Sequence, residues 1–314
     1  MLSISQSQIM YVLALDRTGS FSEAAEACHV TQSTLSTMVR KLEDQMGFQL
    51  FDRSKKPIEL TLEGRHLIDQ FKVVSNEYEN LSELIQEAKS QFEGVLKIGI
   101  IPTLAPFILP LFLDKFMKKH GDLQFNISEI TTKEILKKLR LRELDIGLLS
   151  LPIDDSDFDQ TSLFQEDFLV YDARSQAGGK KTYQIKDIDL TRLWLLEESH
   201  CMTSQIGKIC HLRESSQNHN KLVFNSGSIL SLLELVNINK GITLLPRLAT
   251  LQEHIIDPAW LHPLASPAPA RDVGLVTHKS FTKRRLFKLL KEDITKAVEP
   301  YLMNTGRINL IAPF

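Results

Sequence analysis

Residues 20–60 read SFSEAAEACHVTQSTLSTMVRKLEDQMGFQLFDRSKKPIEL and contain the clearest structural pattern of the chain. Ser20 and Glu23 have the spacing of a capping box, which predicts the start of a short, alanine-rich helix. After a turn, Thr31 predicts the N-cap of a second helix. The period of its apolar residues is helical and defines a buried face, made of Leu35, Val39, Leu42 and Met46. Two short helices joined by a tight turn predict a helix-turn-helix, which we assign to a domain of residues 1–60.

The opposite face of the second helix has short polar side chains, which suit contacts with DNA base edges and phosphates. The periodicity alone is equally consistent with a solvated surface helix. Residues 51–60 favour DNA binding, because they predict two short strands around a basic turn, the wing of a winged helix. The candidate DNA-binding residues are Thr31, Ser33, Thr34, Ser36, Thr37, Arg40, Arg53 and Lys55.

Composition limits the class of protein. The chain has 314 residues, a net charge of −2 and 43% hydrophobic residues, values typical of a globular protein with several domains. Only three cysteines are present, which argues against a disulfide-stapled secreted scaffold. We expect no signal peptide, no membrane span and a cytoplasmic location. Any DNA contact must come from a local basic patch, because residues 1–65 hold seven basic and eight acidic residues.

Residues 61–93 predict a long helix with a dimer seam. Apolar residues follow one another at alternating steps of four and three, which is the repeat of a coiled coil. The seam consists of Leu67, Phe71, Val74, Tyr78, Leu81, Ile85 and Ala88. The alternative is a helix that packs against its own domain. A dimer would place two recognition helices on successive major grooves of a roughly two-fold symmetric operator.

Residues 94–300 predict an α/β domain of two lobes, with lobe I at about 94–165 and 270–300 and lobe II at about 166–269. Strands are expected at 95–101, 123–127, 145–149, 193–196, 222–224, 241–245 and 273–276, with helices between them. Such alternation favours a parallel sheet. Residues 301–314 are assigned to a C-terminal tail. Ligands bind such sheets beyond the carboxyl ends of the strands, where Thr103 and Thr132 lie. Threonine at these positions more often caps a helix.

Cys201 and Cys210 flank a predicted helical segment. If residues 201–210 are helical, the two α-carbons lie about 13 Å apart, whereas a disulfide needs about 4.4–6.8 Å. Cys210 is expected on the buried face with Ile206 and Ile209. Cys201 is expected at the helix N-terminus beside His200, where the helix dipole and a protonated imidazole would lower its pKa. Two inert buried cysteines are the simpler alternative, and a zinc site with His200 and His211 lacks the usual spacing.

The N-terminal motifs resemble those of LysR-type transcriptional regulators. The resemblance rests on FSEAA at 21–25, TQSTLS at 31–36, RKLE at 40–43, LFDR at 50–53 and LTLEG at 60–64. Ser33 replaces a usual proline, and Met38 a frequent glutamine. The resemblance implies a winged helix-turn-helix, a linker helix and a periplasmic-binding-protein-like sensor domain. It also implies double-stranded DNA as partner and assembly into dimers and tetramers.

The sensor segments resemble the hydrogen-peroxide-sensing members of that family. The similar segments are 98–103, 195–201, 241–246 and 271–276, together with the nine-residue step from Cys201 to Cys210. The resemblance implies that Cys201 is the peroxidatic cysteine and Cys210 the resolving cysteine. It implies a peroxide pocket formed by Thr103, Thr132, His200, Ser228 and Arg271. Ser228 is carried over although Ser226-Gly227-Ser228 departs from the family pattern.

The sequence therefore predicts a peroxide-responsive activator of transcription, switched by a reversible disulfide between Cys201 and Cys210. Thiol reductants would reset it, and an activator is expected to contact RNA polymerase. No cofactor, metal or enzymatic turnover is expected. One alternative is a LysR-type regulator that binds a small organic effector between its lobes, with inert cysteines. Another is a solute-binding protein or thiol peroxidase built on the same lobes.

Overall fold

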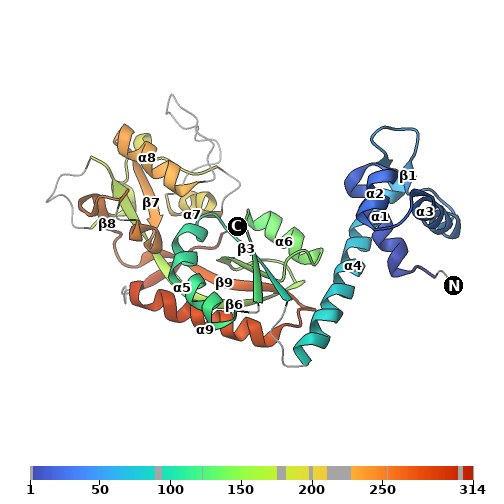
Figure 1. The fold of residues 1–314 in the computed structure, drawn as a ribbon. Helices are drawn as coiled ribbons and strands as arrows, with labels where there is room; N and C mark the ends of the chain where they lie inside the picture. The colour runs from blue at the N-terminus through green and yellow to red at the C-terminus, as the bar shows by residue number, and fades with distance from the viewer. Residues whose placement is uncertain are drawn as a thin grey trace. The chain divides into compact units, whose positions relative to one another are not determined.

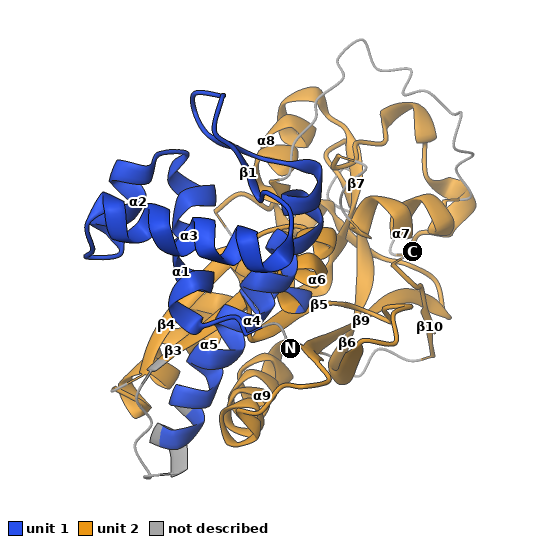
Figure 2. Cartoon of the chain, turned by 90° about the vertical axis from the view of Figure 1, so that its right-hand side faces the viewer, with its two compact units in different colours: residues 1–91, 140–143 blue, residues 92–139, 144–314 orange. Residues whose placement is uncertain are grey.

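The computed structural model describes residues 3–88, 94–121, 123–174, 182–197, 201–210, 228–252, 254–302 and 307–313. The chain divides into two compact units, residues 1–91 with 140–143 and residues 92–139 with 144–314 (Figure 2). Each unit has a hydrophobic core of its own. In the described part of the chain, no helix is long and apolar enough to cross a membrane.

The first unit is a winged helix-turn-helix followed by a long helix (Figure 1). Its helices are α1 (Gln6–Thr18), α2 (Phe21–Ala27) and α3 (Gln32–Met46). The wing is an antiparallel pair of short strands, β1 (Phe51–Asp52) and β2 (Glu59–Leu60). Gly19 ends α1 at φ +63°, and a Cβ atom there would lie 2.7 Å from Cβ of Pro57. The wing can therefore pack against the end of α1 only because this residue is glycine.

The long helix α4 (Leu62–Ala88) uses the predicted seam in two ways. Phe71 is buried, and Leu67 and Val74 are partly buried, against the helix-turn-helix core. Further along, Tyr78 is 42% exposed, Leu81 54% and Ile85 52%. The first half of the apolar stripe thus follows the alternative of packing on its own domain. The second half is an apolar stripe at the same spacing that is largely exposed.

The second unit is built on one mixed sheet in the order β4-β3-β5-β9-β6-β7, with β10 beside β9 and β8 beside β6. Three strands are parallel, namely β3 (Gly94–Ile100), β4 (Leu123–Glu129) and β5 (Ile146–Leu151). The prediction of a parallel sheet holds for these three strands and for the short pairing of β10 with β9. β9 (Ala268–His278) returns antiparallel to β5, and β6 and β7 (Ile242–Pro246) continue antiparallel.

The predicted elements of this unit need two corrections. The strand β6 (Phe158–Asp172) is missing from the prediction, although it is the longest strand described. Residues 193–196, predicted as a strand, form only a single bridge from Leu193 to Ile242. Residues 222–224, also predicted as a strand, lie outside the described residues. β6 pairs with β9 up to Asp167 and with β7 and β8 (Leu261–Pro263) from Phe168, so this one strand runs through both lobes.

The helices of the second unit are α5 (Ala105–Lys119), α6 (Thr132–Arg140), α7 (Cys201–Ile209), α8 (Ile229–Asn239) and α9 (Arg284–Val298). α5 and α9 pack against each other. α6 lies close over β3 and β5, because a Cβ atom on Gly147 would stand 2.6 Å from Cγ2 of Ile135. This close approach brings the N-terminus of α6, with Thr132, to the carboxyl edge of the parallel strands.

The segment predicted as a C-terminal tail contributes a strand. β10 (Ile308–Leu310) runs parallel to β9, in register with Ala268–Ala270. Beyond it, the carbonyl of Ile311 accepts a hydrogen bond from Nε2 of Gln205 (2.8 Å), and that of Ala312 accepts one from Nζ of Lys208 (3.1 Å). Both donors belong to α7. Movement of α7 would therefore break contacts with the C-terminal segment.

Candidate peroxide site and candidate DNA interface

The polar face of α3 is exposed as the sequence predicts. Leu35, Val39 and Leu42 are fully buried, and Ser33, Thr34, Thr37 and Arg40 are exposed, with Ser36 half-buried. The hydroxyl of Thr31 accepts a hydrogen bond from the backbone N–H of Thr34 (3.2 Å) and so caps α3. The exposed cation and hydroxyls of this face form a surface that fits a major groove.

Arg53 makes contacts within the first unit that the sequence did not predict. Its guanidinium donates to Oε2 of Glu43 (2.6 Å), and it lies over the ring of Phe21 (5.2 Å to the centroid). The other oxygen of Glu43 accepts from the backbone N–H of Leu50 (2.8 Å). Arg53 thus ties the wing to α3 and is only partly available to a phosphate. Lys55, at the tip of the wing, pairs with Glu59 (2.7 Å) on the surface.

We expect Arg40→Ala to weaken operator binding by about 1–3 kcal/mol. Lys55→Ala should weaken binding to all DNA sequences and lower the salt slope by about one unit. Fluorescence anisotropy with operator and random duplexes at several salt concentrations measures both quantities. Lys118→Ala removes a surface charge from α5, where Lys118 pairs with Asp114 (2.8 Å), and is the matched control. Wild-type affinity and slope in both variants would refute the winged-helix interface.

The second unit gathers three of the five predicted peroxide residues at the carboxyl edge of the parallel strands, namely Thr103, Thr132 and Arg271. Thr103 follows β3, Thr132 follows β4, and Arg271 lies on β9 opposite Glu166 of β6. Arg271 is fully buried, and its Nη1 donates to Oγ1 of Thr103 (2.9 Å). Its Nη2 lies 2.7 Å from Oε1 of Glu166. The Glu166 carboxylate also accepts from the backbone N–H of Leu248 (2.9 Å). Arg271 is thereby held in one orientation.

Neither Thr103 nor Thr132 caps a helix, so the alternative of a helix-capping role is wrong for both. The hydroxyl of Thr103 accepts from Arg271, and α5 has no side-chain cap. At α6 the capping contacts belong to Thr131, which exchanges hydrogen bonds with Glu134. Thr132 is instead buried, and its hydroxyl hydrogen-bonds the thiol of Cys201. Both threonines therefore contribute to the cluster around Cys201.

Cys201 opens α7 and is 3% exposed within this cluster. Burial raises the pKa of its thiol, opposite to the direction expected from the sequence. Arg271 acts against this shift, as do the side chains of Ser150 and Thr132 and the backbone N–H of Met202, all of which favour the thiolate. His200 lies outside the described residues, and Ser228 is exposed at the N-terminus of α8, where it caps the helix.

Cys210 lies at the opposite end of α7. Its backbone N–H still donates to the carbonyl of Ile206 (2.8 Å), which continues the helical hydrogen bonding. The two cysteines therefore lie at opposite ends of an intact helix. Both cysteines are free thiols. Burial raises the pKa of Cys210 to about 11, so it is a neutral thiol. A zinc ion cannot be shared by the two sulfurs in this arrangement, and the other proposed ligands, His200 and His211, lie outside the described residues.

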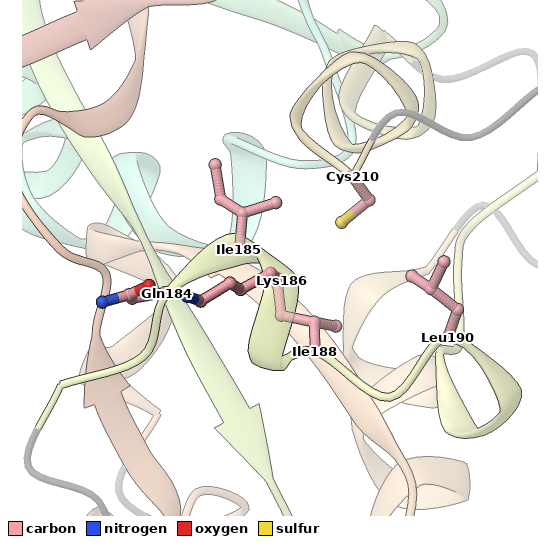
Figure 3. A pocket seen from close by; sticks show the side chains of 6 residues that line it. All are labelled: Gln184, Ile185, Lys186, Ile188, Leu190 and Cys210. Atoms are coloured by element: carbon pink, nitrogen blue, oxygen red, sulfur yellow. The ribbon is translucent and has the colours of Figure 1, made fainter.

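Cys210 lines a pocket of about 430 Å³ in lobe II (Figure 3). The rest of its lining is mostly apolar and comes from residues 184–190, including Ile185, Ile188 and Leu190. Thr103, Thr132 and Arg271 are not among the lining residues. The two thiols therefore occupy separate environments, a polar buried cluster for Cys201 and an apolar pocket for Cys210.

The sequence did not predict two buried polar residues, one at the carboxyl edge of the sheet and one on α7. Ser150, near the end of β5, is 1% exposed, and Gln205, one turn after Cys201 on α7, is fully buried. Ser150 could have been found, because it stands at the carboxyl end of a third parallel strand, as Thr103 and Thr132 do for their strands. Gln205 becomes visible only when the C-terminal segment is seen beside α7.

A DNA-binding winged helix joined to a sensor domain of this topology defines a class of one-component transcriptional regulators. The chain belongs to the LysR family of these regulators: residues 6–65 match the bacterial regulatory helix-turn-helix protein, lysR family, and residues 89–298 match the LysR substrate binding domain. The prediction of an N-terminal helix-turn-helix followed by a LysR-type sensor domain is confirmed.

Among characterised relatives, the HTH-type transcriptional regulator EstR of Acinetobacter baylyi is 32% identical over 93% of this chain and 96% of its own length. The DNA-binding transcriptional dual regulator OxyR of Escherichia coli is 31% identical over 90% of this chain and 92% of its own. A full-length OxyR variant from Pseudomonas aeruginosa superposes with a TM-score of 0.74, at 29% identity, covering 93% of this chain and 98% of that chain. The resemblance to OxyR seen in the sequence is thus confirmed.

Proposed function

We propose that this LysR-type regulator senses hydrogen peroxide through Cys201 and is switched by a disulfide between Cys201 and Cys210. The observation that carries the proposal is the Cys201 cluster, in which a buried thiol lies with the Thr132 hydroxyl and the fixed guanidinium of Arg271. The relatives named as hydrogen peroxide-inducible genes activators support it. So does a Corynebacterium glutamicum OxyR mutant whose structure is H2O2-bound (TM-score 0.60, 25% identity).

The first chemical step is oxidation of the thiolate. The Cys201 sulfur attacks one peroxide oxygen, so that an S–O bond forms as the O–O bond breaks. The sulfur loses two electrons, and the departing hydroxide takes up a proton and leaves as water. The Arg271 charge and the Thr132 hydroxyl favour the thiolate, and Thr103, whose oxygen accepts from Arg271, keeps its own proton to donate to the peroxide.

The second step forms the disulfide. The Cys210 thiol attacks the sulfenic sulfur, and water leaves. Because α7 keeps the α-carbons about 13 Å apart, the helix must unwind before the sulfurs can bond. Unwinding removes the contacts of Gln205 and Lys208 with the C-terminal segment. Such a rearrangement of packing would change how sensor domains associate in a dimer or tetramer, and so how the DNA-binding units are spaced on the operator. Thioredoxin- or glutaredoxin-type reductants in the cytoplasm would reverse it.

The organic-effector alternative has less support. An organic effector bound beside Thr103 would meet an Arg271 that is already neutralised by Glu166, since both side chains are fully buried and bonded to each other. Contact with RNA polymerase remains a prediction, which rests on the expected role as a transcriptional activator.

A non-reducing peptide map before and after stoichiometric peroxide tests the proposal. We expect a single new cross-linked peptide pair that contains Cys201 and Cys210, which dithiothreitol separates again. If the number of free thiols does not change after peroxide treatment, the cysteines are inert and the proposal is refuted.

A further inference from the structure

Residues 307–313, the C-terminal strap, join strand β9 to helix α7. The centre of the strap is Ile311, which forms hydrogen bonds in two directions. Its backbone N–H donates to the carbonyl of Ala270 on β9 (2.8 Å), and its carbonyl accepts from Nε2 of Gln205 on α7 (2.8 Å). One residue of the strap therefore bridges the strand that carries Arg271 and the helix that must unwind for the disulfide to form.

The strap is short and lies at the surface. Within it, β10 pairs with β9 over three residues, and the carbonyl of Arg307 accepts from the backbone N–H of Ala268 (3.0 Å). Lys208 of α7 adds a hydrogen bond to the carbonyl of Ala312 (3.1 Å). The strap also faces solvent, since Leu310 is 46% exposed. So short a strand at the surface can open at a lower free energy than the domain as a whole.

Gln205 is the residue of α7 whose burial depends on the strap. Its side chain is fully buried, and its Nε2 donates to the strap. Its Oε1 is buried without a hydrogen-bond partner among the described residues. A buried amide is unfavourable unless it is hydrogen-bonded, so the bond to the strap offsets part of the cost of placing Gln205 in the core. Water can satisfy the whole amide once α7 unwinds, so loss of the strap destabilises the helical form relative to the unwound form.

We propose that the C-terminal strap holds α7 in its helical form and so sets the rate at which Cys210 reaches oxidised Cys201. This inference rests on the proposed function and adds a regulatory element to it. In the second step the Cys210 thiol displaces water from the sulfenic sulfur and an S–S bond forms, which requires that α7 unwinds and leaves the strap. A second peroxide competes for the same sulfur, oxidising it to sulfinic acid with loss of water. Release of the strap therefore favours the reversible disulfide over the sulfinic acid.

Ile311→Pro tests the strap without changing the sequence of α7. Proline has no N–H to donate to the carbonyl of Ala270, so the bond between the strap and β9 is lost. In the reduced full chain, we expect the backbone amides of α7 to exchange with deuterium about fivefold faster, which is the factor that the net stabilisation by one hydrogen bond implies. After stoichiometric peroxide, samples alkylated at intervals should show the Cys201–Cys210 disulfide forming about fivefold faster, while Cys201 consumes peroxide at the wild-type rate.

Asn309→Ala, at an exposed position of β10, keeps both hydrogen bonds of Ile311 and is the matched control. A chain that ends at residue 306 lacks the whole strap and should change both rates more than Ile311→Pro does. Wild-type exchange of α7, or a wild-type rate of disulfide formation, in both strap variants would overturn the inference.

The exchange measurement separates this inference from the proposed function, because it uses the reduced protein without peroxide. Faster exchange of α7 in proteins that form no disulfide after peroxide treatment would retain the contact between the strap and α7 and refute the disulfide switch.

Discussion

Cys201→Ser is expected to abolish both peroxide consumption and the transcriptional response, while DNA binding by the reduced form stays at the wild-type level. The reason is chemical: the thiolate is the nucleophile, and a serine hydroxyl at the same buried position does not ionise in the accessible pH range. Stopped-flow measurement of peroxide loss and a promoter-reporter assay give the two readouts. The substitution is nearly isosteric, so the melting temperature should change little.

Cys210→Ser should give a different phenotype. Cys201 still reacts with about one equivalent of peroxide, but the product stops at sulfenic acid or oxidises further, because no resolving thiol remains. A sulfenic-acid trap should therefore label the Cys210 variant and leave the Cys201 variant unlabelled. Cys28 is half-buried in the other unit, at the end of α2, and Cys28→Ser should keep the full response. Equal labelling of the two sensor variants, or a peroxide-dependent disulfide to Cys28, would contradict the assigned roles.

The second large effect is expected at the exposed half of the seam on α4. Replacing Leu81 and Ile85 together by Glu places like charges in an interface between two helices, where an unpaired buried charge is strongly unfavourable. The dimer should dissociate, and operator binding should be lost, since one recognition helix cannot span both half-sites. Light scattering and operator titration measure the two consequences.

Leu81 and Ile85 are the informative positions because they are largely exposed in the single chain. Val74 is a poorer choice, since it packs against the helix-turn-helix core and its replacement would destabilise the unit itself. The control is Ser82→Glu, which adds one of these two negative charges at an exposed position of α4 outside the seam. A dimer that persists in the Leu81/Ile85 variant would exclude this stripe as the interface.

Local sequence patterns were sufficient to predict a helix or strand wherever only one of its faces packs against the core. The recognition helix, its cap at Thr31 and its buried face at Leu35, Val39 and Leu42 follow from spacing alone. The separation of Cys201 and Cys210 also follows from spacing once the segment is helical. These features depend on interactions within a few residues, which a sequence displays directly.

Other parts of the fold depend on pairing between distant segments. The strand β6 lacks a regular alternation over its whole length, because every residue of its second half from Glu166 to Asp172 is buried. Residues 193–196 resemble a strand in composition but have only one bridging partner. The strand β10 exists because the edge of β9 is available to it. None of these partners can be identified from local sequence.

By itself, the sequence determined the class of regulator, the recognition helix, the apolar repeat of α4 and the identity of the two sensor cysteines as candidates. Only the tertiary structure decided the surroundings of Cys201. It paired Arg53 with Glu43, turned Thr103 toward Arg271, and buried Thr132 beside the thiol. It also showed that the pKa of Cys201 is raised where the sequence predicted that it is lowered, because desolvation depends on how many distant segments cover the sulfur. Burial of that kind is a property of the packed chain and leaves no local pattern in the sequence.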